Sequence, residues 1–178
     1  KSPCIIDESA DLKLAARRVV FGKYLNCGQT CVAPDYICCH ASVKDAFIRE
    51  VKKQILLQFD AHPLENPNYG KIINKKHFDR ICALIDGHKV VHGGHTDTEL
   101  LRIEPTVMDH VTYDDPVMQE EIFGPVMPIL TYDSLDKLIH KINSMPHPLA
   151  LYFFTRSKTA ARKVTSQCQF GGGCINDT

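Results

Sequence analysis

Leu149-Ala150-Leu151-Tyr152-Phe153-Phe154-Thr155 is apolar at nearly every position, and this stretch decides the fold class. A strand with one face in water alternates apolar and polar residues, whereas a parallel-sheet strand that is covered on both faces is apolar throughout. The stretch therefore predicts a buried strand. The other strand-like runs are residues 1–6, Tyr36 to His40, Lys89 to His92 and Val126 to Thr131.

Helical patterns alternate with these strand-like runs along the chain. Their apolar stripes begin at Leu12, Phe47, Phe78, Leu135 and Ala160. Strands that alternate with amphipathic helices are typical of α/β domains, in which helices cover a mostly parallel sheet. We therefore expect an α/β domain with helices on both faces of the sheet.

Several helix ends can be predicted from residues that cap the free N–H groups of a first turn or that terminate a helix. Asp7 or Ser9 is expected to cap the first helix, while Asn74 and Ser134 are expected to cap the third and fourth. Gly87 is expected to close the third helix. The basic residues of the second helix are expected to form its solvated face: Lys44, Arg49, Lys52 and Lys53.

Length and composition limit the classes of protein that this chain can represent. A chain of 178 residues, 44% of them hydrophobic, suits one domain with a sizeable core, and we assign residues 1–178 to that domain. Lys+Arg and Asp+Glu both number 21, which argues against a nucleic-acid partner. No apolar run approaches the roughly 20 residues that span a bilayer, so no membrane partner is expected. Eight cysteines within regular patterns indicate reduced thiols and a cytoplasmic location.

A candidate nucleophile lies in Asn26-Cys27-Gly28-Gln29-Thr30-Cys31, where a helical pattern meets a turn. Gly28 permits a tight backbone there, and a catalytic thiol needs an exposed sulfur beside N–H groups that can hold an oxyanion. Cys31 is the favoured nucleophile. Cys27 is the rival one helical turn away, and a buried structural thiol is the inert alternative for Cys31.

A second segment, Gln119-Glu120-Glu121-Ile122-Phe123-Gly124-Pro125, strengthens this interpretation. Together, Gly28 to Cys31 and Glu120 to Pro125 resemble the G-Q-x-C and E-E-I-F-G-P motifs of the NAD(P)-dependent aldehyde dehydrogenases. Shorter matches occur at Glu104 to Val107, Pro148 to Leu151 and Gly171 to Asp177, so that the resemblance covers nearly the whole chain. The sequence from Gly22 to Cys27 is most similar to that of the class-three subgroup.

The resemblance implies a three-layer α/β/α catalytic domain of aldehyde dehydrogenase type with a mostly parallel sheet. Because the family continues beyond both ends of this chain, it also implies a fragment. The dinucleotide-binding domain, the oligomerisation segment, the general-base glutamate and the oxyanion-holding asparagine would lie outside residues 1–178. The fragment alone is expected to be inactive, and the full-length protein to be a homo-oligomer, either a dimer or a tetramer.

The implied reaction is the oxidation of a small-molecule aldehyde to a carboxylic acid with NAD or NADP. Cys31 would form a thiohemiacetal and then a thioester. Glu121 and Phe123 match the family's cofactor-binding positions, where a carboxylate accepts hydrogen bonds from the nicotinamide ribose and a ring packs beside the sugar. Without the resemblance, Glu120 and Glu121 would be interpreted as a solvated turn and Phe123 as a core residue.

Other candidate sites are less specific. His88, His92 and His95 form an H-x-x-x-H-x-x-H run, and Cys27 with Cys31 could form half a metal site, but neither has partners at a suitable spacing, so no metal is expected. One turn apart on the third helix, His77 and Arg80 could reach the adenosine end of a cofactor, although a solvated helix face is the favoured interpretation.

Two alternatives to the main functional interpretation stay open. A CoA-acylating or semialdehyde dehydrogenase relative would form the same thioester on Cys31 but use another acceptor or substrate. A non-catalytic scaffold domain of the same fold would retain the architecture without turnover. Thiol reactivity separates an enzyme from a scaffold, and product analysis with and without CoA separates the two enzymes.

Overall fold

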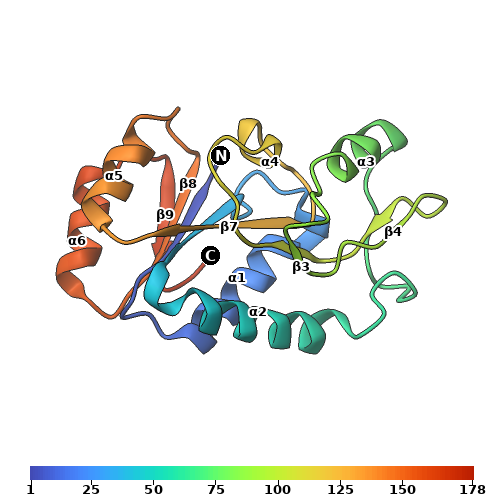
Figure 1. The fold of residues 1–178 in the computed structure, drawn as a ribbon, viewed down its shortest axis with the longest axis horizontal. Coiled ribbons are helices and arrows are strands. Elements are labelled where there is room, and N and C mark those ends of the chain that lie inside the picture. The colour runs from blue at the N-terminus through green and yellow to red at the C-terminus, as the bar shows by residue number, and fades with distance from the viewer.

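A computed structural model describes the whole chain, residues 1–178, as a three-layer α/β/α structure (Figure 1). The central sheet has seven strands in the order β3-β6-β7-β2-β1-β8-β9. All neighbouring strands are parallel except β3, which is antiparallel to β6 at one edge. These strands are β1 (Pro3–Ile6), β2 (Tyr36–His40), β3 (Val90–His92), β6 (Thr106–Met108), β7 (Val126–Tyr132), β8 (Ala150–Phe154) and β9 (Gly172–Ile175). The expected α/β class and the mostly parallel sheet are confirmed.

Helices cover both faces of the sheet, as the alternation of patterns predicts. Beneath the sheet in Figure 1, α1 and α2 run together, while α3 and α4 lie above it and α5 and α6 lie towards β8 and β9. The α-helices are α1 (Leu12–Tyr24), α2 (Lys44–Phe59), α3 (Lys75–Cys82), α4 (Pro116–Gln119), α5 (Leu135–Asn143) and α6 (Lys158–Gln167). Two short 3-10 turns, η1 (Leu25–Gly28) and η2 (Ala41–Val43), and a small hairpin of β4 (Thr96–Asp97) and β5 (Arg102–Ile103) complete the structure.

Each face of the sheet has its own apolar core, because successive strand residues point to opposite sides. In β1, Ile5 packs with residues of α3, α5 and α6, whereas Cys4 and Ile6 pack with residues of α1 and α2. The same alternation occurs in β8, where Phe153 and Phe154 belong to opposite cores. The strands are therefore buried on both faces, which explains the unbroken apolar stretch from which the fold class was predicted.

The predicted helix starts are partly confirmed. Asn74 and Ser134 cap α3 and α5 as expected, each accepting a main-chain N–H of its first turn. The predicted cap of α1 is wrong: Asp11 accepts the Leu14 N–H, whereas Asp7 accepts hydrogen bonds from the hydroxyls of Ser9 and Thr155 at the carboxyl end of β1. The Asp7 carboxylate therefore bonds to Thr155, just after β8, instead of capping α1.

Two further expectations about helices are wrong. α3 ends at Cys82 rather than at Gly87, because the chain leaves the helix through tight turns at Leu84 and Ile85. Lys44 does not lie on a solvated face of α2, since its ammonium pairs with the buried Asp109 carboxylate at 2.8 Å. The helices of this structure are all too short or too polar to cross a membrane.

Candidate active site

The segments that carry the two sequence motifs meet at the amino-terminal edge of the parallel sheet. The Cys31 loop leads into β2, the Glu120 to Pro125 segment leads into β7, and Lys1 lies just before β1. These three strands are adjacent, and their pairing brings Tyr36 opposite Pro3 and Ile37 opposite Ile129. The register of the sheet therefore places the predicted nucleophile and the predicted cofactor turn at the amino-terminal ends of neighbouring strands.

Cys31 lies on an exposed turn whose two flanks are held by hydrogen bonds. Before it, the Gln29 side chain accepts the Ile73 N–H at 3.0 Å and donates to the Lys71 carbonyl at 3.0 Å. After it, the Tyr152 hydroxyl donates to the Val32 carbonyl at 2.5 Å. The Cys31 N–H itself donates to no other main-chain carbonyl. The loop thus presents an accessible thiol together with an uncommitted N–H donor on a braced backbone.

Direct backbone contact at Gly28 and Gly124 joins the two motifs. Gly28 has a left-handed backbone with φ +73, and a Cβ at this position would lie 2.3 Å from the Gly124 carbonyl oxygen. Gly124 in turn has no room for a side chain, because a Cβ there would lie 2.6 Å from the Ile81 side chain of α3. Only a glycine at position 28 allows the nucleophile loop to pack this closely on the second motif.

The second motif forms a turn in which buried and exposed side chains alternate. Ile122 is completely buried, whereas Glu121 and Phe123 on either side of it are exposed. The backbone of Phe123 is in the left-handed region, with φ 49, and the residue as a whole is 38% exposed. Left-handed backbone in a bulky residue is strained, and such strain is most often found at functional sites. The turn therefore presents a carboxylate and an aromatic ring to solvent.

Arg80 of α3 holds the outer side of this turn. Its guanidinium donates to the main-chain carbonyls of Glu121 and Ile122 at 3.3 and 2.5 Å and to the Glu120 carboxylate at 3.1 Å. Glu120 is thus occupied by an ion pair, while the Glu121 side chain remains exposed to solvent. Arg80 is therefore not simply part of a solvated helix face, the favoured expectation, because its guanidinium holds the turn; a contact with the adenosine end of a cofactor stays a prediction.

Three charged residues lie on the inner side of the turn, and we call Lys1, Asp35 and Lys23 the inner charge cluster. Asp35 accepts the Ile122 N–H at 3.1 Å and forms an ion pair with Lys1 at 2.6 Å. Lys1 also donates to the main-chain carbonyls of Glu120 at 2.6 Å and Val117 at 3.0 Å.

Lys23 of α1 completes the inner charge cluster. Its ammonium lies 4.0 Å from the Asp35 carboxylate and makes no hydrogen bond. The side chain is only 1% exposed, and this burial lowers the pKa of Lys23 from 10.5 to about 8, although Asp35 raises it in part. Burial also lowers the pKa of Lys1, and Asp35 again opposes the shift. Asp35 is therefore shared between two lysines.

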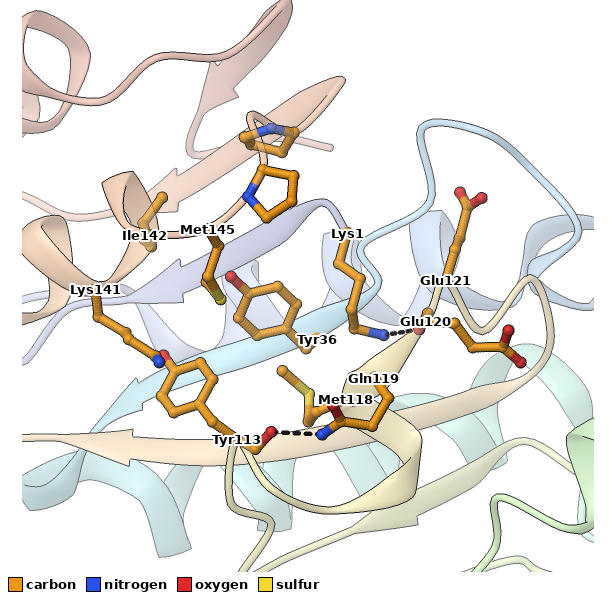
Figure 2. A pocket seen from close by; sticks show the side chains of 12 residues that line it. Lys1, Tyr36, Tyr113, Met118, Gln119, Glu120, Glu121, Lys141, Ile142 and Met145 are labelled. Atoms are coloured by element: carbon orange, nitrogen blue, oxygen red, sulfur yellow. Dashed lines mark hydrogen bonds between the residues drawn. The ribbon is translucent and has the colours of Figure 1, made fainter.

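A cleft of about 370 Å³ opens beside the turn. Figure 2 shows Tyr36, Tyr113 and Met118 around it, with the Lys1 amine directed to the main chain of Glu120. Glu121 lines the rim of the cleft, and its side chain leaves the turn in a different direction from that of Glu120. Cys31 does not line this cleft, so the cleft and the predicted nucleophile are separate features.

The remaining thiols are poor candidates for the nucleophile. The rival Cys27 is 2% exposed, and burial raises its pKa. Burial likewise raises the pKa of Cys38 and of Cys39 to about 12. Because the thiolate is the reactive species, these buried groups are disfavoured relative to an exposed sulfur. Cys174 is also exposed, but it lies on the edge strand β9, at the end of the sheet away from β7.

The histidine run does not form a metal centre in this structure. No group of three or more His, Cys, Asp or Glu side chains is arranged to hold a metal ion. His95 instead pairs with Glu104 at 2.8 Å, and His92 lines a separate cleft in which burial lowers its pKa. These side chains are accounted for by local hydrogen bonding and packing.

Comparisons with known proteins agree with this architecture. A profile described as "Aldehyde dehydrogenase family" matches residues 1–178. The chain is 49% identical, over its whole length, to the 4,4'-diaponeurosporen-aldehyde dehydrogenase of Staphylococcus aureus, and 44% identical over 99% of its length to the dimeric NADP-preferring aldehyde dehydrogenase of Rattus norvegicus. The chain spans 39% of the length of each of these curated relatives.

Solved structures show the same similarity. A substrate-bound Staphylococcus aureus AldH superposes with a TM-score of 0.98 at 48% identity, covering 100% of this chain and 39% of that one. An NADP-dependent glyceraldehyde-3-phosphate dehydrogenase from Bacillus halodurans, solved with NADP, superposes with a TM-score of 0.89 at 28% identity, covering 100% of this chain and 38% of that one.

Proposed function

The chain belongs to the aldehyde dehydrogenase family, and we propose that the protein containing it oxidises an aldehyde to a carboxylic acid with NAD or NADP through a covalent adduct on Cys31. The contact between Gly28 and Gly124 carries this proposal, because it joins an exposed thiol to a turn that presents an exposed carboxylate and an exposed ring. A scaffold domain would not need a braced loop with an accessible thiol and a free N–H beside it.

Cys31 is the proposed nucleophile. Its thiolate attacks the carbonyl carbon of the aldehyde, forming a carbon–sulfur bond and placing the electron pair of the C=O π bond on oxygen. The Cys31 N–H, which has no main-chain acceptor, is the proposed donor to this oxygen, as oxyanion-stabilising donors are in acyl-transfer enzymes. After oxidation, hydrolysis of the resulting thioester releases the acid and regenerates the thiol.

The turn of Glu121 and Phe123 fits a nicotinamide nucleotide. An ionised carboxylate only accepts hydrogen bonds, which suits the two hydroxyls of a ribose, and an exposed ring provides an apolar surface for the sugar. When bound, the nicotinamide accepts the hydride that leaves the former aldehyde carbon. Arg80 and Lys1 hold the backbone of the turn, and the proposed role of Glu121 and Phe123 is to orient the nucleotide towards Cys31.

We further propose that residues 1–178 are the catalytic domain of a longer enzyme. The general-base glutamate, the oxyanion-holding asparagine and the dinucleotide-binding domain would then lie outside this chain. The difference in length from the relatives supports this arrangement, because the chain spans 39% of each. Residues 1–178 alone are accordingly proposed to be inactive. The longer enzyme is proposed to be a cytoplasmic homo-oligomer.

The test is a pair of cysteine variants of the full-length protein. Cys31→Ala is expected to abolish NAD(P)-dependent aldehyde oxidation, whereas Cys174→Ala, which removes the other exposed thiol, is expected to retain it. Substantial turnover by Cys31→Ala would overturn the proposal. Acyl-CoA formation when CoA is supplied would instead identify the CoA-acylating alternative, and a parent protein that oxidises no aldehyde would favour the scaffold.

A further inference from the structure

The inner charge cluster is unbalanced, which makes it an unusual feature of the interior. It combines two ammonium groups with one carboxylate, and Lys23 is buried without any hydrogen bond. Burying an ammonium away from water is costly unless it is paired and hydrogen-bonded. A lysine in this position therefore supplies charge rather than a specific bond, and its nearest counter-charge is Asp35 at 4.0 Å.

Asp35 connects this charge directly to the turn. Its Oδ1 atom accepts the Ile122 N–H at 3.1 Å and is also the atom nearest the Lys23 ammonium, while Oδ2 contacts Lys1 at 2.6 Å. Ile122 is thereby fixed at three points: its N–H by Asp35, its carbonyl by Arg80 and its side chain by complete burial.

Fixing Ile122 determines where its neighbours point. When the side chain of a residue in a turn is held inward, the residues on either side are directed outward, and here these are Glu121 and Phe123. Lys1 adds a second restraint through the Glu120 carbonyl. The inner charge cluster hydrogen-bonds neither exposed side chain, so it acts on Phe123 through the backbone of the turn, and on Glu121 both through that backbone and through the charges of Lys1 and Lys23.

We propose that Asp35 and Lys1 are positioning residues that set the orientation of Glu121 and Phe123 towards the nicotinamide nucleotide, and that Lys23 is the buried counter-charge that keeps Asp35 in place. This inference rests on the proposed function, because it assigns the turn to the cofactor. It adds residues whose hydrogen bonds go to the backbone of the turn and its lead-in, and whose effect is on nucleotide binding rather than on the thiol.

The test measures cofactor affinity in the full-length protein by calorimetric titration with NAD and with NADP, well below the unfolding temperature. Asp35→Asn and Lys1→Met are each expected to weaken cofactor binding roughly tenfold or more, the effect of losing a hydrogen bond to a charged group. The rate at which iodoacetamide alkylates Cys31 without cofactor is expected to stay within about twofold of the parent, because neither residue contacts the thiol.

A matched control separates positioning from stability. Asp109→Asn breaks a similar buried pair, with Lys44 at 2.8 Å, on another part of the sheet. It is expected to lower stability but leave the cofactor dissociation constant within about twofold of the parent, since distant sites act independently. The double variant Asp35→Asn/Lys23→Met is expected to recover part of the affinity lost in Asp35→Asn, because it removes the ammonium left without a partner.

The outcomes distinguish the two proposals. A parent protein that neither binds NAD(P) nor oxidises an aldehyde overturns the proposed function and this inference together. A parent that does both, with Asp35→Asn and Lys1→Met binding cofactor as tightly as the parent, overturns the inference alone. Equal weakening by Asp109→Asn also overturns it, since the effect would then be general destabilisation. If Asp35→Asn does not fold, Lys1→Met gives the same decision. Absence of recovery in the double variant overturns the role of Lys23.

Discussion

Replacing Gly28 by alanine tests the contact that joins the two motifs. An L-residue with φ near +73 is disfavoured by about 1–2 kcal/mol relative to its right-handed conformation. The new Cβ would also lie 2.3 Å from the Gly124 oxygen and 3.1 Å from the Lys23 oxygen, both of which are backbone atoms that cannot rotate away. Forcing the two loops apart adds about 1–3 kcal/mol, as overpacking does elsewhere.

A smaller favourable effect partly offsets this strain. Alanine lowers the conformational entropy of the unfolded chain relative to glycine, which stabilises the folded state by about 0.4–1 kcal/mol. We therefore expect Gly28→Ala to lower the free energy of unfolding by about 2–4 kcal/mol. Urea unfolding followed by circular dichroism measures the change. Gly87→Ala is the matched control, since its Cβ would meet no atom within 4 Å, and a change below about 0.5 kcal/mol is expected. A Gly28→Ala variant as stable as Gly87→Ala would refute the argument.

Three more predictions follow from the charges and thiols. Glu121→Gln is expected to weaken cofactor binding in the full-length protein about tenfold, since a charged hydrogen bond contributes about 1.5–3 kcal/mol; equal affinity in a calorimetric titration would remove Glu121 from the site. Lys23→Met removes an ammonium whose burial lowers its pKa from 10.5 to about 8, so the difference in unfolding free energy between this variant and the parent is expected to depend on pH. From pH 8 to 10.5 this difference should shift in favour of the parent by about 3 kcal/mol, because the native lysine has lost its proton there and the unfolded one has not; urea titrations that give a constant difference would contradict the assigned burial. Iodoacetamide should modify exposed Cys31 and Cys174 before buried Cys38 in the native chain, and mass spectrometry that finds Cys38 labelled first would contradict the assigned burial.

Much of the sheet could be predicted because its strands carry strong patterns. β2 has the predicted bounds, Tyr36–His40, and β8 lies within the apolar stretch at Leu149 to Thr155. β9 was missed because Gly172 and Gly173 have no side chains to give a strand pattern, and it forms through pairing with β8. The cap of α1 was misassigned because three possible capping residues precede that helix, Asp7, Ser9 and Asp11, and tertiary hydrogen bonds decide between them.

The candidate site was only partly visible in the sequence. Cys31, Glu121 and Phe123 were found through a family resemblance, and their chemical roles remain predictions. Arg80 and Asp35 were missed as parts of the turn, because their contacts with Ile122 span 42 and 87 residues. From sequence alone a charged residue is expected at the surface, and only the folded structure shows which residue it pairs with. Lys23 offered even less indication, since a buried lysine with no hydrogen bond has the same local sequence context as a solvated one.

The position of the site at the amino-terminal edge of three strands has a consequence for folding kinetics. Lys1 and Glu120 meet across 119 residues of sequence, so no local segment can assemble the site by itself. Contacts of such high sequence separation form slowly, because the entropy of loop closure is lost before they contribute. The site should therefore appear together with the pairing of β1, β2 and β7 rather than before it. The Ile122 amide, which is buried and bonded to Asp35, would report that moment through its protection from hydrogen exchange.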